Sequence, residues 1–476
     1  MAKPLNIVVA LTDDHGQWAA GCYGNREIHT PTLDHLAATG VQMENAFTPS
    51  PVCSPARASF FTGLFPSQHG VHDWIHPDFE EPAWLGEDTP TLAGLLHAGG
   101  YQTALCGKWH IGQNTRPQPD FDYWRAVDRN YPPRDGNYVM TSGEVIAREG
   151  YHTQLITDDA VNFLRERDAS RPFFLFVGYF GTHSPWAGHP ERLVAPYRAC
   201  TFDDVPDGPT YTGGRLTGES LASSRYNRRE ALAQYYASVT HIDEGMGRIM
   251  DELEAQGLRD DTLVVYTSDH GLNCGQHGIW GKGNGTRPLN MLEESVRVPL
   301  IINCPGKRKL QADDDGRVGM EPAAHDGYVL GGQRRTEFVD HTDLFATLLD
   351  YAGVDVPPDT PHTYPGHSFR GMVQDGRGSP QWKNVQTAEC GPVRMARTSR
   401  HKLVLREPLG SNELYDLVDD PGETQNRYSD DPTTANALED AVTQFFDVCS
   451  TPERAGTRGT ALRQHNYVEA WRGEKE

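Results

Sequence analysis

Four short apolar runs, each followed at once by polar residues, constrain the fold of this chain more than any other feature. An apolar run of this length without alternation is typical of a strand buried on both faces. Segments with helical spacing, several opened by Thr-Pro and closed by Gly, lie between the runs. Strands alternating with helices predict an α/β fold with a large, mostly parallel sheet flanked by helices. The runs are residues 5–12, 101–106, 173–179 and 262–267, and the helical segments are 30–40, 89–99 and 228–256.

The residues that follow these four runs are chemically capable side chains. In open α/β sheets, ligands bind just beyond the carboxyl ends of the strands. We therefore expect the side chains after the four strands to converge on one site. They are Asp13, Asp14, Lys108, His110, His183, Asp269 and His270.

A second motif, Cys53-Ser54-Pro55-Ala56-Arg57, is predicted to open a short helix. Ser54 is placed to cap it, Pro55 to occupy its first position, and Gly63 to end it. Cys53 would then lie at the helix mouth, where free backbone N–H groups favour an anion. Arg57 follows about one turn later. A nucleophile beside an anion site is what attack on a sulfate or phosphate ester requires.

The acidic residues at the strand ends predict a metal site. Asp13 and Asp14 are adjacent, and Asp269 stands beside His270. Adjacent like charges are costly unless a cation neutralises them. Three carboxylates and one imidazole form a hard, oxygen-rich donor set, which suits Ca²⁺ or Mg²⁺ better than zinc.

Length and charge limit the remaining possibilities. The chain has 476 residues, too many for one ordinary core, and a formal net charge of −22 from 65 acidic and 43 basic residues. An acidic surface repels nucleic acid and anionic membranes, so neither is an expected partner. The eight cysteines are scattered and indicate neither a zinc module nor a disulfide framework. With no secretory signal or membrane-spanning run, a cytoplasmic location is expected.

The sequence pattern changes near residue 366. Residues 393–397 and 401–406 are predicted to form a hairpin, 413–417 a further strand, and 435–446 a helix. We therefore predict a catalytic α/β domain over residues 1–365 and a C-terminal subdomain over 366–476, with a small antiparallel sheet and a terminal helix. Two stretches, around residues 206–214 and 311–334, have the composition of surface insertions.

The Cys53–Arg57 motif, continued by Thr62-Gly63, resembles the signature of the formylglycine-dependent (type I) sulfatases of the alkaline-phosphatase-like superfamily. The resemblance is firm over residues 5–112 and 262–306. It implies the alkaline-phosphatase-like fold. It also implies that a maturation enzyme oxidises Cys53 to formylglycine, whose hydrated aldehyde attacks sulfur.

The resemblance further implies the metal ligands, which are Asp13, Asp14, Asp269, His270 and the formylglycine made from Cys53. Ca²⁺ is the expected ion, with Mg²⁺ and Mn²⁺ as alternatives. His270 stands where the family often has Asn, so the choice of metal stays open.

Roles for the other matching residues also come from the resemblance. Lys108 and Lys282 would hold sulfate oxygens and offset the charge that grows as the ester bond breaks. His110 would orient the aldehyde hydrate. His183 would protonate the leaving oxygen, together with Lys282. Arg57 would hold the nucleophile.

Two rivals remain open: a phosphonate monoester or phosphate diester hydrolase with the same fold and nucleophile, and an inactive sugar-binding relative. The second would be expected to have lost Cys53, Arg57 or a metal carboxylate, and none is lost.

The preferred substrate is a sulfated sugar. The identity of the sugar and the oligomeric state of the protein are left open. Five residues could grip a sugar or an aryl ring, or could only pack the rim of the site: Asp73, Trp74, His76, His277 and Trp280.

Overall fold

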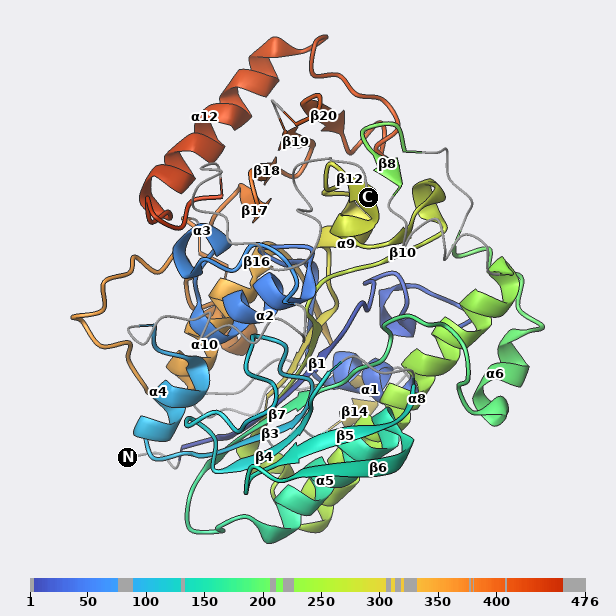
Figure 1. The fold of residues 1–476 in the computed structure, drawn as a ribbon, viewed down its shortest axis with the longest axis vertical. Coiled ribbons are helices and arrows are strands. Elements are labelled where there is room, and N and C mark those ends of the chain that lie inside the picture. The colour runs from blue at the N-terminus through green and yellow to red at the C-terminus, as the bar shows by residue number, and fades with distance from the viewer. Residues whose placement is uncertain are drawn as a thin grey trace.

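A ten-stranded sheet runs through the computed structural model of the chain (Figure 1). The structure describes residues 4–75, 89–129, 133–205, 211–216, 227–304, 310–312, 318–320, 332–375, 378–379, 381–406 and 409–456. The sheet order is β16 (Gln333–Asp340), β2 (Val41–Phe47), β13 (Leu300–Asn303), β9 (Thr262–Ser268), β1 (Asn6–Thr12), β7 (Phe173–Gly178), β3 (Gln102–Gly107), β4 (Tyr123–Val127), β5 (Arg134–Met140) and β6 (Val145–Tyr151). The central strands from β9 to β4 are all parallel, which confirms the predicted sheet.

The register of the central strands brings their carboxyl ends level. Thr12, the last residue of β1, lies opposite Ser268, the last residue of β9. On the other side, β7 pairs with both β1 and β3, and its terminal Gly178 lies opposite Leu11 and Gly107. The residues that follow these strands therefore emerge side by side at one edge of the sheet.

Helices cover both faces of the sheet, as the uninterrupted apolar strands predict. Alternate residues of β1 point to opposite faces: Val8 and Ala10 pack toward α1 (Pro31–Thr39), α5 (His152–Glu166) and α8 (Arg228–Ala255). Ile7 and Val9 pack toward α2 (Cys53–Thr62), α4 (Leu92–Ala98) and α10 (His341–Ala352). The carboxyl edge of the sheet therefore lies between two apolar cores, one on each face.

The start of α2 differs from the prediction. The helix begins at Cys53 with Val52 as its N-cap, so Pro55 occupies the third helical position rather than the first. Proline fits there because the N–H groups of the first turn have no partner within a helix. Ser54 is not a cap, since its hydroxyl accepts a hydrogen bond from the Ile75 N–H at 2.9 Å. Cys53 still lies at the helix mouth.

The other predicted helices and strands are present with small shifts at their ends. One of these shifts is in α4, which begins at Leu92 because the Thr91 side chain, not Thr89, accepts a bond from the Gly94 N–H at 2.9 Å. The remaining elements are η1 (Gly21–Tyr23), α3 (Pro66–His69), α6 (Glu191–Tyr197), β8 (Arg215–Leu216), η2 (Arg259–Asp261), β10 (Asn273–Cys274), η3 (Gln276–Gly278), β11 (Trp280–Gly281), η4 (Gly283–Gly285), β12 (Thr286–Arg287), α9 (Glu293–Val296), β14 (Leu310–Ala312), β15 (Val318–Met320) and α11 (Arg370–Asp375).

The C-terminal part forms the predicted small antiparallel sheet. Its strands are β17 (Gln386–Cys390), β18 (Val393–Arg397), β19 (His401–Leu405) and β20 (Glu413–Asp416), with α12 (Pro432–Val448) packed against β18 and β19. Figure 1 places this sheet and α12 beyond one edge of the large sheet. The division at residue 366 stays a prediction, and Phe369 and Val373 pack into the core of the large sheet.

The predicted insertions fall largely outside the described residues. Directly after the first insertion, β8 pairs with β12. Of the second, β14 and β15 form a hairpin, and its last two residues begin β16. Among the described helices, none combines the length and apolar character needed to cross a membrane.

Gly63 is predicted to be essential for packing α2 against α10. Its φ is +68°, and a Cβ built there would lie 2.4 Å from the Phe345 ring of α10. Gly353, which ends α10, has φ +66° but open space around it. Gly353→Ala should therefore show only the backbone cost, about 1–2 kcal/mol. Gly63→Ala should cost about 1–3 kcal/mol more, because overpacking is added.

Denaturant unfolding of the two variants measures this difference directly. Equal losses of stability in both variants would contradict close packing of α2 on α10. Because Cys53 opens α2, Gly63→Ala should also lower activity, whereas Gly353→Ala should leave it near the parent value.

Candidate active site

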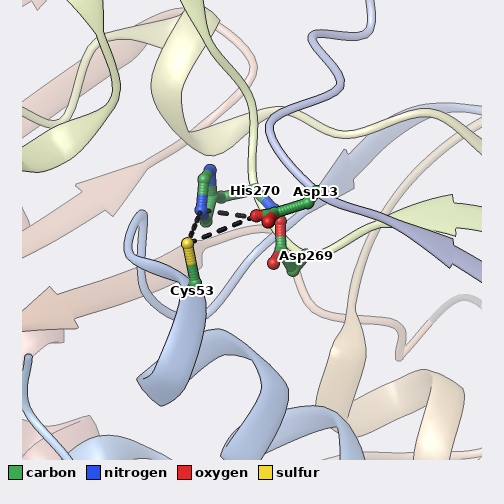
Figure 2. A group of neighbouring side chains, drawn as sticks. All are labelled: Asp13, Cys53, Asp269 and His270. Atoms are coloured by element: carbon green, nitrogen blue, oxygen red, sulfur yellow. Dashed lines mark hydrogen bonds and ion pairs between the residues drawn. The ribbon is translucent and has the colours of Figure 1, made fainter. Parts of the chain in front are cut away.

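The residues after three strand ends and the start of α2 meet in one buried cluster. Asp13 follows β1, Lys108 follows β3, and Asp269 follows β9, while Cys53 enters from α2. Figure 2 shows the Cys53 sulfur directed toward Asp13 and His270. The convergence expected from the sequence therefore holds for these residues.

Cys53 is only 2% exposed and is surrounded by polar atoms. Its Sγ lies 3.3 Å from Asp13 Oδ1, 3.3 Å from His270 Nε2 and 2.8 Å from Lys282 Nζ. Burial, with the Asp13 carboxylate, raises the pKa of the Cys53 thiol above its usual value. The unmodified side chain is therefore a protonated thiol near neutral pH.

Each buried carboxylate of the cluster has a cationic partner. Lys108 forms an ion pair with Asp13, Lys282 Nζ lies 2.7 Å from Asp14 Oδ1, and Arg57 Nε lies 2.9 Å from Asp269 Oδ2. Burial alone would raise the pKa of the Asp13 and Asp14 carboxyls, but the lysines and His183 lower it overall. For Asp269, burial and Asp13 outweigh Arg57, so its pKa is raised.

His270 is arranged to present a lone pair to the cluster. Its Nδ1 lies 2.9 Å from the Gly271 carbonyl, which can only accept, so Nδ1 carries the proton. Burial, and then Lys282, lower the pKa of His270 to about 3. The ring is therefore neutral, and Nε2 is a free ligand atom facing Cys53.

The donor set fits a hard divalent cation. Ligand atoms of Asp13, Cys53, Asp269 and His270 lie within 4.8 Å of one another, and those of Asp14, Cys53 and His183 do the same. Three carboxylates with one neutral imidazole match the oxygen-rich sites of Ca²⁺ and Mg²⁺. All five residues predicted as metal ligands thus belong to the cluster.

Two further residues position Asp14, and the sequence analysis missed both. Asp14 has φ +61°, a conformation that non-glycine residues rarely adopt. Its carbonyl accepts hydrogen bonds from the Thr182 hydroxyl at 2.7 Å and the Tyr235 hydroxyl at 3.0 Å. Thr182 could have been found from the sequence, because it directly precedes His183, a predicted site residue. Tyr235 lies on a helix face that predicts only apolar packing.

Arg57 and the two predicted histidines contribute in different ways. Arg57 Nη1 donates to the Lys108 carbonyl at 2.9 Å, while its buried Nη2 has no hydrogen-bond partner among the described residues. His110 is buried with Nε2 3.2 Å from the Ile75 carbonyl, and burial with nearby Lys108 lowers its pKa. His183 is half-buried, with Nδ1 2.7 Å from the Ser184 carbonyl. It therefore offers Nε2 as the atom that can exchange a proton at the edge of the cluster.

The residues predicted at the substrate rim are dispersed. Asp73 is buried, Trp74 is half-buried against the apolar core under the small sheet, and His76 lies outside the described residues. His277 is buried, with Nε2 3.0 Å from Glu294 Oε2. Trp280 is only 6% exposed and packs on Trp186, with ring centroids 5.4 Å apart. This burial favours the packing role that the sequence left open for Trp280.

The fold and the cluster define an α/β enzyme with a buried, highly charged site at the carboxyl edge of its sheet. The sulfatase family model matches residues 5–354, and the chain belongs to the sulfatase family. The family supports the enzyme class expected from the Cys53 motif.

Individual relatives extend over most of the chain. An N-acetylglucosamine-6-O-sulfatase of Bacteroides thetaiotaomicron is 28% identical, covering 89% of this chain and 82% of that protein. A solved structure of a protein in complex with its substrate D-glucosamine-2-N,6-O-disulfate has a TM-score of 0.78 at 24% identity, covering 94% of this chain and 98% of that one. A phosphonate monoester hydrolase of Agrobacterium radiobacter has a TM-score of 0.68 at 20% identity, covering 94% and 95%. Both solved structures therefore have the same fold as this chain.

Arg57→Lys should lower kcat at least tenfold although the charge is kept. Lysine offers one ammonium in place of the planar fork that now reaches both Asp269 and the Lys108 carbonyl. Steady-state kinetics on a small aryl sulfate measure the loss.

The matched control is Arg165→Lys, whose guanidinium makes a comparable two-bond contact with Glu252 at the exposed surface. It should leave kcat within twofold, since exposed ion pairs contribute little. A kcat for Arg57→Lys as high as that of the control would show that the fork has no part in the reaction.

Proposed function

We propose that this chain hydrolyses a sulfate monoester carried by a saccharide, with Cys53 converted to formylglycine. One observation carries the proposal: Cys53 opens a helix at the centre of a buried cluster of carboxylates, lysines and a neutral imidazole. The relative named N-acetylglucosamine-6-O-sulfatase supports a saccharide substrate. In this proposal the hydrate of the formylglycine supplies the attacking oxygen.

The residues around Cys53 have the chemistry that the reaction requires. Asp13, Asp14, Asp269 and His270 would hold a divalent cation, Ca²⁺ before Mg²⁺ or Mn²⁺, which when bound withdraws charge from the oxygens that contact it. His110 approaches the cluster from the loop after β3 and would keep the hydrate oriented.

The cationic side chains of the site would bind the sulfate group and protonate the leaving group. The ammonium groups of Lys108 and Lys282 lie at the cluster and would bind sulfate oxygens, where charge increases as the S–O bond to the sugar breaks. His183 is less buried than the carboxylates and would give its proton to the leaving sugar oxygen. Arg57 Nη2, which has no hydrogen-bond partner in the described part of the chain, would contact the formylglycine hydrate.

The second candidate function is hydrolysis of a phosphonate monoester or a phosphate diester. The fold that the chain shares with the Agrobacterium radiobacter phosphonate monoester hydrolase supports this candidate. The inactive sugar-binding alternative has no observation in its favour, since Cys53, Arg57 and the acidic residues all meet in one cluster. Neither nucleic acid nor a membrane is proposed as a partner. The maturation enzyme acting on Cys53 is the one protein partner that the proposal requires.

A substrate panel should separate the candidates. We expect N-acetylglucosamine 6-sulfate to exceed a phenylphosphonate monoester and a phosphate diester in kcat/KM by at least tenfold, because the proposed reaction is at sulfur. Peptide mass spectrometry on the same sample should find the Cys53 fragment about 18 Da lighter than the thiol form. Activity should follow that converted fraction across preparations.

Cys53→Ala is the control, since it cannot be converted and should be inactive on every substrate. Faster turnover of the phosphonate ester than of all sulfated saccharides would show that the chain is a phosphorus-ester hydrolase, the second candidate. Full activity with wholly unmodified Cys53 would refute the formylglycine proposal.

Asp269→Asn should abolish both cation binding and turnover. The amide keeps the shape of the side chain but removes a charge that balances the cation. Calcium content by elemental analysis and kcat on the sulfated substrate should fall together, at least a hundredfold for kcat. Asp260→Asn, an exposed aspartate before β9, is the control and should leave both unchanged. Full activity of Asp269→Asn after exhaustive chelation would contradict the metal assignment.

A further inference from the structure

A polar cavity of about 430 Å³ lies between the large domain and the small sheet and contains none of the residues assigned to the reaction. Three segments distant in sequence form its walls: residues 211–213, the loop at His277, and the region of β20 with the turn that follows it. Its volume falls within the usual range for small-molecule sites. The lining residues are Tyr211, Thr212, Gly213, His277, Ser411, Glu413, Tyr415, Glu423, Thr424 and Asn426.

The cavity walls are attached to one another and to the segment that carries Lys282. The Tyr211 N–H donates to the His277 carbonyl at 2.9 Å, and the Tyr211 hydroxyl donates to Glu413 Oε1 at 2.9 Å. β8, just after Tyr211, pairs with β12, just after the loop of Lys282. His277 precedes Lys282 by five residues, so their Cα atoms are at most about 18 Å apart. The cavity is therefore within reach of a short saccharide bound at the sulfate site.

One hydroxyl that lines this cavity has no hydrogen-bond partner among the described residues. Tyr415 lines it and is only 4% exposed, yet its hydroxyl makes no hydrogen bond within the described part of the chain. Behind the wall, outside the lining itself, the buried Arg406 guanidinium pairs with Glu413 and lies over the Tyr211 ring. The Tyr415 hydroxyl is therefore available to a hydrogen-bonding ligand in the cavity.

The charges of the lining exclude a second sulfate. The lining carboxylates are Glu413, paired with Arg406, and Glu423, whose Oε1 lies 2.8 Å from Lys402 Nζ. His277 is the one side chain among the described lining residues that can carry a positive charge, and it pairs with Glu294. An anionic ligand would thus meet carboxylates and no uncommitted cation. A neutral ligand rich in hydroxyl groups avoids that repulsion and can bond to both tyrosines and carboxylates.

We propose that this cavity binds an unsulfated sugar unit linked to the sulfated one, so that the small sheet selects for oligosaccharides over monosaccharides. The inference rests on the proposed function at Cys53, which it extends by a second subsite. Tyr415 would donate its hydroxyl proton to the sugar, and Glu413 and Glu423 would accept from sugar hydroxyls.

The kinetic test compares N-acetylglucosamine 6-sulfate with a disaccharide in which the same unit carries one unsulfated galactose. The parent enzyme should prefer the disaccharide in kcat/KM. Tyr415→Phe removes one hydrogen bond to the ligand and none within the protein, so it should fold normally and lower that preference about five- to tenfold, mainly through KM. Ser411→Trp, which fills the cavity from its exposed side, should abolish the preference.

Tyr364→Phe is the matched control. Its ring stacks on Phe345 beside α10, away from the cavity, so the same loss of a hydroxyl is made outside the proposed site. It should leave the preference intact. A preference unchanged in both Tyr415→Phe and Ser411→Trp would overturn the inference.

A binding experiment keeps this inference separate from the reaction at Cys53. Isothermal titration of the Cys53→Ala protein with N-acetyllactosamine, which carries no sulfate, measures saccharide binding that depends on neither the sulfate nor turnover. Binding that is weakened by Tyr415→Phe but not by Tyr364→Phe supports the subsite even if the enzyme prefers a phosphorus ester. Absence of binding while sulfated N-acetylglucosamine is hydrolysed would leave the proposed function intact and refute the subsite.

Discussion

The ion pairs buried around Cys53 are the constraint on which the rest of the structure depends. Carboxylates from two strand ends are matched by Lys108, Lys282 and Arg57, which come from three further segments. A buried charge without its partner costs several kcal/mol. Misplacement of any one of these segments would leave a buried charge unpaired and would destabilise the folded chain by that amount. The parallel register of β9, β1, β7 and β3, and the seating of α2 against α10, supply the required alignment.

The small sheet extends this constraint to the polar cavity. Lys402 of β19 lies between Glu293 of α9, at 3.1 Å, and Glu423, at 2.8 Å. An apolar core that includes Phe47, Val393 and Val404 joins the same two parts of the molecule. Both contacts fix the wall of the polar cavity relative to the strand ends. Selection of the saccharide and chemistry at sulfur would therefore depend on one rigid arrangement.

Much of the site could be predicted from the sequence because its residues follow strands whose apolar character is unmistakable. Asp13 and Asp269 come directly after such strands, and the Cys53 motif is compact enough to be recognised by itself. The beginning of α2 was predicted less well. Ser54 and Pro55 form a common helix-starting pair, but the Ser54 hydroxyl bonds to Ile75, a partner distant from any local pattern.

The sequence by itself determined the alternation of strands and helices, the residues at the strand ends and the presence of a short helix at the Cys53 motif. These are local properties, set by hydrophobic runs, turn residues and caps. Only the tertiary structure decided that Tyr235 supports the Asp14 carbonyl, that Trp280 is buried against Trp186, and that Tyr415 faces a cavity. Such contacts join segments far apart in the chain. Side-chain spacing records which face of an element is apolar, but not which distant group that face will meet.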